Sequence, residues 1–205
     1  MTRIIAGLAG GRRLAVPPGR STRPTSDRTR EGLFGTVTAI RGGLDGAAVL
    51  DLYAGSGAVG LESLSRGAAD ALLVESDARA ARVIRANIEA VALSGARLLA
   101  DRVERVLARG PGGAPPHDFV FADPPYATSD SDIERMLGEL SRQGWLAAGA
   151  LVAIERATRS GPLSWPSGYR ADRCRSYGEA TLWYGLRAGA ASAGPGPAEP
   201  QQTGA

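Results

Sequence analysis

The stretch VLDLYAGSGAVGLE, residues 49–62, decides the fold. A buried strand is predicted by the apolar residues Val49, Leu50, Leu52 and Tyr53. The small residues 54–57 predict a sharp turn before apolar residues return at helical spacing. Gly55 and Gly57 let the backbone bend with no side chain in the way. A ligand can then lie against main-chain N–H groups at the start of the helix.

This glycine turn alone fits two cofactors. Residues 55–60 satisfy G-x-G-x-x-G, and Glu75 lies near the distance expected for a ribose contact of a nicotinamide cofactor. Asp51 distinguishes a dinucleotide from a cofactor with an amino-acid moiety, because its carboxylate would repel a pyrophosphate but would attract the ammonium group of an amino-acid moiety. S-adenosylmethionine carries that ammonium group. We favour it over a nicotinamide cofactor and over a purely structural turn.

Composition limits the class of protein. A chain of 205 residues suits one domain that buries about 70% of its unfolded surface. No run approaches 18 apolar residues and no apolar signal segment follows Met1, so we expect a cytoplasmic protein. Cys174 and His117 are each the single residue of their type, so we expect no metal, no disulfide within the chain, and a solvated histidine. We also expect a monomer.

The positive charge is concentrated near the amino terminus. All 24 basic residues are arginine; residues 1–41 hold eight of them against two acids, a net of +6, and residues 42–205 hold sixteen against nineteen acids, a net of −3. A local excess of this kind attracts a polyanion.

A basic hairpin is predicted at the start of the chain, with strands at residues 3–6 and 13–16 joined by a glycine-rich turn. Its arginines are either solvated or in contact with phosphates, and we favour phosphates because further arginines follow at once. The residues expected to bind nucleic acid are Arg3, Arg12, Arg13, Arg23, Arg28 and Arg30. A helix capped by Ser26 should follow, with Leu33, Val37 and Ile40 as its apolar stripe.

Strands and helices then alternate, which is typical of an α/β protein with a parallel sheet and helices on both faces. Strands are expected at 47–53, 71–75, 97–100, 119–121 and 151–154, and helices at about 59–66, 77–93, 102–109 and 133–143. Residues 171–187 should form an antiparallel pair around Gly178. The expected organisation is a basic extension (1–41), a Rossmann-like domain (42–187) and a disordered tail (188–205).

Acidic residues follow three successive strands. Asp51, Glu75 and Asp101 should meet at the carboxyl edge of the sheet, where α/β proteins bind ligands. Glu75 could accept from ribose hydroxyls and Asp101 from an adenine amine, although Asp101 could also cap a helix. The expected cofactor-binding residues are Asp51, Tyr53, Ala54, Gly55, Ser56, Gly57, Glu75, Ser76, Asp101 and Arg102.

The tetrapeptide Asp123-Pro124-Pro125-Tyr126 follows the fourth strand of this series. Proline has no N–H group, so the Asp123 carboxylate and the neighbouring carbonyls form a site of acceptors. Such a site suits an exocyclic amine, and Tyr126 offers a flat face for a base. With a bound sulfonium, these residues predict methyl transfer to an aromatic amine, and we expect all four to be catalytic.

Over residues 2–187 the chain resembles the RsmD-type methyltransferases, through RIIAG, GRRLAVP, RPTSDRTREGLF, VLDLYAGSGAVGLESLSRGA, VESD, ADPPY and Tyr177-Gly178. The D-P-P-Y tetrapeptide is shared by amine methyltransferases that act on nucleic-acid bases, whereas the amino-terminal segments are specific to this family. The resemblance implies a seven-stranded methyltransferase sheet, S-adenosylmethionine at residues 51–57 and Glu75, and catalysis at residues 123–126. It also implies a substrate, the N2 amine of a guanine (guanine(966)-N(2) type) in 16S ribosomal RNA or the assembling small subunit.

Other functions stay open from the residues themselves. A DNA adenine-N6 or cytosine-N4 methyltransferase would use the same tetrapeptide, but such enzymes usually need a target-recognition domain for which 205 residues leave little room. A non-catalytic nucleic-acid-binding protein with a Rossmann-like fold should have lost the site acids, which are present. A nicotinamide oxidoreductase is the third alternative.

Overall fold

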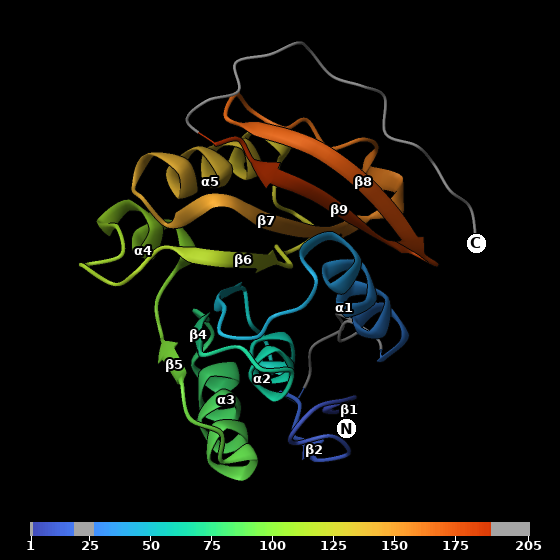
Figure 1. Ribbon diagram of the computed structural model, residues 1–205, viewed down its shortest axis with the longest axis vertical. Helices are drawn as coiled ribbons and strands as arrows, with labels where there is room; N and C mark the ends of the chain where they lie inside the picture. The colour runs from blue at the N-terminus through green and yellow to red at the C-terminus, as the bar shows by residue number, and fades with distance from the viewer. Residues whose placement is uncertain (1, 19–26, 190–205) are drawn as a thin grey trace. The chain divides into compact units, whose positions relative to one another are not determined.

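The computed structural model describes residues 2–18 and 27–189 (Figure 1). In these residues the chain forms an α/β protein with a mostly parallel sheet of seven strands, five α-helices and a small amino-terminal hairpin. The predicted Rossmann-like fold with a hairpin extension is thereby confirmed. The chain divides into two compact units, Met1–Val106 and Leu107–Ala205, which are described in turn.

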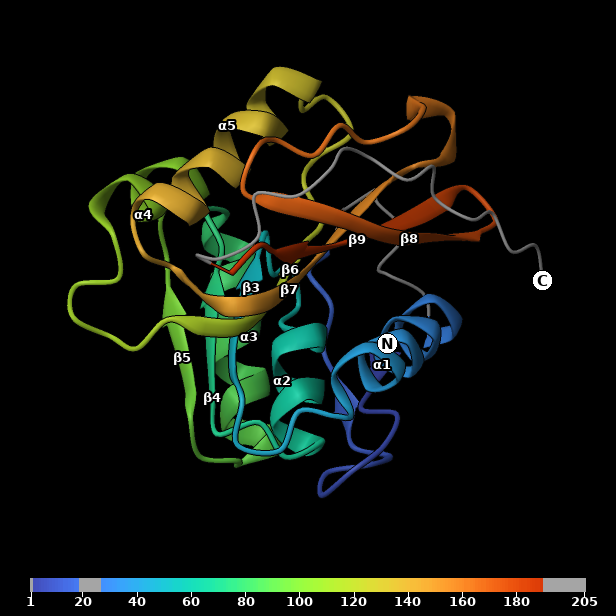
Figure 2. The same ribbon diagram turned by 45° about the horizontal axis from the view of Figure 1, so that its top comes forward.

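The first unit contains three parallel strands in the order β5-β4-β3. Its elements are β1 (Thr2–Arg3), β2 (Arg13–Leu14), α1 (Asp27–Arg41), β3 (Ala48–Leu52), α2 (Ala58–Ser65), β4 (Asp70–Val74), α3 (Ala78–Val91), β5 (Ala96–Leu99) and the start of α4 (Val103–Arg109). Each lies within a few residues of its predicted range. Figure 2 shows α2 and α3 beside these strands.

Apolar side chains of β3 and β4 form the core of this unit, and α2 packs on both strands. On α1 the predicted stripe is confirmed at Leu33 and Val37, which are buried, whereas Ile40 is only half-buried. On α3 the buried face contains Asn87 between Ile84 and Val91, whereas Ile88 is only half-buried. A polar side chain therefore lies inside the apolar stripe of α3.

The hairpin is shorter than predicted. β1 and β2 pair only at Thr2↔Leu14 and Arg3↔Arg13. Ile4 N–H still donates across the hairpin to the Arg12 carbonyl over 2.9 Å. Beyond Ile4 the backbone takes partners from α2: the N–H groups of Ile5 and Ala6 donate to the Glu62 carboxylate over 2.6 and 3.0 Å. Side-chain acceptors thus replace the ladder that the alternation of residues predicted.

The loop after Ala6 is fixed to the end of α2 by Ser65. The Ser65 hydroxyl donates to the Ala6 carbonyl over 2.6 Å and accepts from Ala9 N–H over 2.9 Å, while Leu8 N–H donates to the Ser65 carbonyl over 2.7 Å. Gly7 has φ +83°, and a Cβ there would stand 1.8 Å from the Ser65 carbonyl oxygen. Only glycine permits this approach.

The second unit has strands in the order β6-β7-β9-β8. Its elements are β6 (His117–Ala122), α5 (Asp130–Arg142), β7 (Leu146–Ala157), a short 3-10 helix (Thr158–Ser160), β8 (Tyr169–Tyr177) and β9 (Ala180–Arg187). β6 and β7 are parallel, and β9 is antiparallel to β7 and β8. The predicted pair of strands around Gly178 is confirmed. β7 is longer than predicted at both ends, because Leu146 pairs with His117 of β6 and the pairing with β9 continues to Ala157.

His117 corrects one expectation. It is 1% exposed and begins β6, with Nδ1 3.2 Å from the Trp145 carbonyl oxygen and its ring stacked on the Trp145 ring at 5.7 Å. The prediction of a solvated histidine is wrong, because pairing with β7 buries a position that the preceding prolines placed in a loop.

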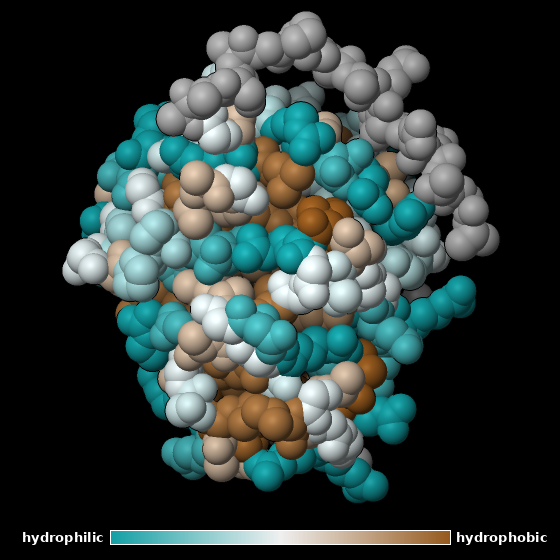
Figure 3. Space-filling view, viewed as in Figure 1, coloured by the Kyte–Doolittle hydropathy of each residue, from teal (hydrophilic) through white to brown (hydrophobic). Residues whose placement is uncertain are grey.

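Some expectations fall outside the described residues, namely the Ser26 cap, Arg23 and residues 190–205 of the tail. The division at residues 41 and 187 stays a prediction. None of the helices in residues 2–18 and 27–189 has the length and hydropathy needed to span a bilayer. On the face drawn in Figure 3, apolar side chains gather around α3 with hydrophilic ones about them.

We expect Glu62→Ala to lower the free energy of unfolding by about 3 kcal/mol, because hydrogen bonds to a charged partner are worth about 1.5–3 kcal/mol each. Glu62 is fully buried and accepts from Ile5, Ala6 and the Arg66 Nε. Urea unfolding measures the loss. Glu62→Gln, which keeps an acceptor oxygen, should lose less, and the exposed Glu89→Ala is the matched control. Equal stability of the Glu62 and Glu89 alanine variants would contradict this assignment.

Candidate functional site

The glycine turn between β3 and α2 is built from left-handed backbone. Tyr53, Gly55 and Gly57 have φ values of 58°, 59° and 77°. For the tyrosine this conformation costs about 1–2 kcal/mol. Its hydroxyl donates to Glu104 over 3.3 Å. Backbone strain of this kind is found at binding sites, where the surrounding structure enforces it.

Glu75 fixes this turn from the neighbouring strand. It follows β4, is 3% exposed, and its carboxylate accepts from Gly55 N–H and from Asp77 N–H, both over 2.8 Å. The carboxyl ends of β3 and β4 are adjacent, with Leu52 opposite Val74. The structure therefore brings the predicted residues 51–57 and Glu75 together, with exposed Ser76 beside them.

Asp51 has a structural role that the sequence did not reveal. It is 1% exposed, and its Oδ2 accepts from Gly60 N–H over 2.9 Å. Burial raises the pKa of Asp51 to about 7; the Gly60 bond works against that rise and the charge of Glu75 adds to it. The carboxyl group thus holds the first turn of α2. Its contact with a cofactor ammonium group stays a prediction.

The two acids at the helix starts are used differently. Asp77 caps α3, accepting from Arg79 N–H over 3.0 Å and Ala80 N–H over 2.8 Å. Asp101 accepts from Arg102 N–H over 2.8 Å and lies 3.7 Å from the Arg105 guanidinium. α4 begins at Val103, so the bond to Arg102 N–H does not cap its first turn, and the helix-cap interpretation of Asp101 stays a prediction. Contact of Asp101 or Arg102 with an adenine stays a prediction.

Asn87 is the residue of this site that the sequence interpretation missed. It is 2% exposed, and its Nδ2 donates to the Ser56 carbonyl over 2.8 Å and to the Ala15 carbonyl over 3.0 Å. Its Oδ1 accepts from Ala15 N–H over 2.9 Å. Asn87 therefore links the glycine turn to the amino-terminal segment. The available signal was its spacing from Ile84 and Val91, which places an amide on a buried face.

Arg30 corrects the predicted set of nucleic-acid contacts. Its side chain is buried, and the guanidinium donates to Thr2 Oγ1 over 3.1 Å, to the Arg3 carbonyl over 2.5 Å and to Asp27 over 2.9 Å. Burial lowers its pKa, against the opposing effects of Glu62 and Asp27. Arg30 holds the start of α1 on β1 and does not face a phosphate.

The other predicted arginines differ in their availability. Arg12 donates to the Ala90 carbonyl over 3.3 Å and to the Val91 carbonyl, and so caps the end of α3. The side chain of Arg3 is 66% exposed and lies 3.6 Å from Asp27. Arg13 and Arg28 are exposed. Their contact with nucleic acid stays a prediction.

In the second unit, the four predicted catalytic residues follow the carboxyl end of β6. Pro124 is buried, and the Pro125 carbonyl accepts from Thr128 N–H over 2.8 Å, which closes a tight turn. The turn leaves Tyr126 63% exposed. A large apolar ring in solvent at the end of a buried strand is suited to stacking on a planar ligand. Across the part of the chain that the structure describes, no cluster of His, Cys, Asp and Glu side chains could hold a metal ion.

The comparisons with known proteins cover almost all of the folded chain. A family model described as Conserved hypothetical protein 95 matches residues 2–185. Ribosomal RNA small subunit methyltransferase D of Escherichia coli K12 is 36% identical over 177 residues, 86% of this chain and 85% of that protein. The protein of the same name from Haemophilus influenzae is 32% identical over 168 residues, 82% and 84% of the two chains. A solved structure of yhhF from Escherichia coli has a TM-score of 0.79 at 35% identity, covering 92% and 98%.

Asp51→Asn should change how stability depends on pH. The folded-state pKa of about 7 lies above the ordinary value of 3.8, so the protonated carboxyl stabilises the fold at low pH and that contribution is lost as pH rises from 3.8 to 7. The shift corresponds to about 4 kcal/mol. Asparagine keeps an acceptor for Gly60 N–H and cannot ionise. The free energy of unfolding of the variant relative to that of the parent should therefore increase as pH rises from 5 to 8.

Denaturant unfolding at both pH values measures this gain. The exposed Asp45→Asn serves as the control for removing one negative charge. A stability difference between Asp51→Asn and the parent that is the same at pH 5 and pH 8 would show that Asp51 titrates as an ordinary carboxylate.

Proposed function

Since the chain belongs to the RsmD family, we propose that it is an S-adenosylmethionine-dependent methyltransferase that modifies the exocyclic N2 amine of a guanine, of the guanine-966 type, in 16S ribosomal RNA. The observation that carries this proposal is the turn at residues 123–126. It combines a carboxylate, two prolines without N–H groups and an exposed tyrosine ring. That combination suits a planar base whose amine must be held by acceptors.

The first unit supports S-adenosylmethionine as the methyl donor. A turn without side chains at residues 55 and 57 allows a ligand carboxylate to approach main-chain N–H groups, and the Glu75 carboxylate beside it suits the hydroxyls of a ribose. Bound there, S-adenosylmethionine supplies a methyl group activated by a sulfonium. Glu75 and residues 53–57 would hold it. Asp51 supports the turn through its hydrogen bond from Gly60 N–H.

The acceptors of residues 123–126 have a defined task. The lone pair of an aromatic amine is delocalised into the ring, so the nitrogen is a poor nucleophile until its N–H bonds are oriented. The Asp123 carboxylate and the Pro124 carbonyl would accept those N–H groups, and the Tyr126 ring would fix the plane of the base. Orientation of this kind is the main contribution to the rate.

Charge and proton transfer need no strongly perturbed acid. As the N–CH3 bond forms and the S–CH3 bond breaks, with the thioether as leaving group, the nitrogen would become cationic and the Asp123 carboxylate would stabilise that charge. The proton of the cationic nitrogen is acidic enough to leave to water or to Asp123. Asp123 therefore both orients the amine and stabilises its developing charge.

Ribosomal RNA is favoured over DNA by the relatives from Escherichia coli and Haemophilus influenzae, which are both named ribosomal RNA small subunit methyltransferase D. Arg3, Arg13 and Arg28 are exposed on the first unit and would contact phosphates. Arg12 contributes less to that contact, because it caps α3.

Deleting the gene should remove one N2-methylguanine from 16S ribosomal RNA, because in this proposal no other enzyme makes that modification. Mass spectrometry of RNA digests from deleted and complemented cells measures the change. Persistence of every N2-methylguanine in the deleted strain would refute the RNA assignment. New loss of N6-methyladenine or N4-methylcytosine from DNA would favour the alternative substrate.

Asp123→Ala should lower methyl transfer by about 10²–10⁴-fold, the range lost with a group that orients and stabilises the reacting centre. S-adenosylmethionine binding, measured by calorimetry, should be unchanged. Glu134→Ala removes an exposed carboxylate of the same unit and is the matched control. Tyr126→Phe should retain activity and Tyr126→Ala should raise KM for RNA. Full activity of Asp123→Ala would exclude its proposed role.

A further inference from the structure

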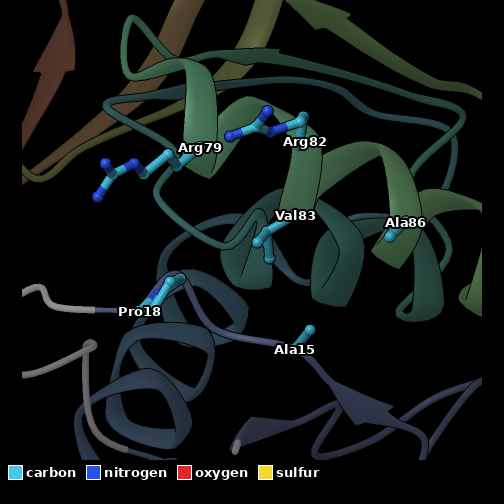
Figure 4. Close-up of a pocket in the computed structure, with 6 residues that line it drawn as sticks. All are labelled: Ala15, Pro18, Arg79, Arg82, Val83 and Ala86. Atoms are coloured by element: carbon cyan, nitrogen blue, oxygen red, sulfur yellow. The ribbon is translucent and has the colours of Figure 1, made fainter.

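A groove lies between α3 and the amino-terminal segment that contains Ala15 and Pro18. It has a volume of about 430 Å³ and is lined by Ala15, Pro18, Arg79, Arg82, Val83 and Ala86. Pockets of about 300–1,000 Å³ hold small ligands. Figure 4 shows Val83 directed into the space between α3 and the segment of Ala15 and Pro18, with Arg79 and Arg82 along the helix.

The rim of this α3 groove is positive. Arg79 and Arg82 are one helical turn apart and exposed, so both guanidiniums can reach one phosphate or two successive ones. Arg85 continues the basic face, and the neighbouring acids are Asp77, whose carboxylate caps α3, and Glu89. In residues 2–18 and 27–189 we find no ion pair or side-chain hydrogen bond to the guanidinium of Arg79 or Arg82.

The floor is apolar and made of small side chains. Ala15, Pro18, Val83 and Ala86 present a low surface on which a sugar or a base can lie, and a guanidinium can stack on the base from the rim. An apolar floor beside paired cations matches the two parts of a nucleotide. A purely electrostatic patch would not need such a floor.

The two walls of the groove are fixed to each other before any ligand binds. Asn87 holds both the N–H and the carbonyl of Ala15, and Arg12 donates to the Val91 carbonyl at the end of α3. A preformed site does not spend binding free energy on ordering its own backbone. The groove is thus a rigid feature of the first unit.

We propose that the α3 groove binds a single-stranded segment of the RNA substrate, with phosphates on Arg79 and Arg82 and a nucleoside on the floor. The inference rests on the proposed function, because the RNA that enters the groove is the one to be methylated. It adds a contact site outside the reacting centre and separate from the arginines of the hairpin. Single-stranded RNA is favoured because its bases are free to leave a stack and lie on the floor.

The test uses the full chain and a fluorescently labelled single-stranded 12-nucleotide oligouridylate, with binding followed by anisotropy over a range of salt concentrations. Arg82→Glu and Arg85→Glu change the net charge equally on one helix, but only Arg82 lines the groove. We expect Arg82→Glu to raise Kd about tenfold more than Arg85→Glu and to lower the salt slope by about one. Arg79→Glu should behave as Arg82→Glu does.

Ala86→Trp fills the floor without changing charge, so it should raise Kd and leave the salt slope unchanged. Thermal unfolding and calorimetry with S-adenosylmethionine check that each variant is folded. Equal Kd values for the Arg82 and Arg85 variants, or an Ala86→Trp variant that binds as the parent does, would overturn the groove. The groove would also be overturned if its variants raised Kd for a 12-base-pair RNA duplex as much as they raise Kd for the single strand. Binding of free uridine monophosphate as tightly as the oligonucleotide would overturn it too.

Methyl transfer by the unchanged protein to 16S ribosomal RNA is measured separately. Its absence would overturn the proposed function whatever the anisotropy shows. Normal transfer with no difference between the Arg82 and Arg85 variants would overturn the groove alone.

Discussion

The Glu75 carboxylate holds two backbone N–H groups at once, that of Gly55 in the turn after β3 and that of Asp77 before α3. Because these bonds involve a charged acceptor with little access to water, they are stronger than neutral ones. They join the ends of two adjacent strands into one rigid edge. The strained backbone of Tyr53 persists because this edge and the packing of Gly57 on Leu73 hold it.

The same device recurs where the amino-terminal segment meets the first unit. Glu62, Ser65 and Asn87 offer side-chain partners to backbone groups of residues 5–15, and Arg30 holds β1 on α1. The basic residues thus divide into two kinds by the hydrogen bonds of their guanidinium groups. Arg12 and Arg30 stabilise the segment, and Arg13 and Arg28 stay exposed for a partner. Charge counting alone treats all four as equal.

Local sequence patterns predicted most of the fold. The apolar run, the glycines and the helical spacing of residues 49–62 identify β3, the turn and α2 within one or two residues, because each depends on neighbours in sequence. The alternation that follows predicts the parallel strands, and Gly178 identifies the turn between β8 and β9. Where sequence reasoning failed, the cause was a distant partner: Trp145 buries His117, and β9 extends β7.

In the candidate site, too, local sequence predicted some features, and others depend on residues distant in the sequence. The acids after the strands and the D-P-P-Y turn were visible in the sequence, because strand ends converge by topology. The burial of Asp51 and Arg30 was not visible, since both depend on hydrogen bonds to residues that no periodicity connects to them. Asn87 was hidden for a simpler reason, its place inside an apolar stripe.

Asn87 makes three hydrogen bonds, two to Ala15 and one to the Ser56 carbonyl. One amide group is therefore shared between a wall of the α3 groove and the turn that follows β3. A pull on the strand-like arm at Ala15 would break two of the three bonds and leave the amide free to rotate away from Ser56. Through this side chain, the amino-terminal segment stabilises the turn after β3. A displacement of Ala15 would therefore also weaken the hydrogen bond that holds the Ser56 carbonyl.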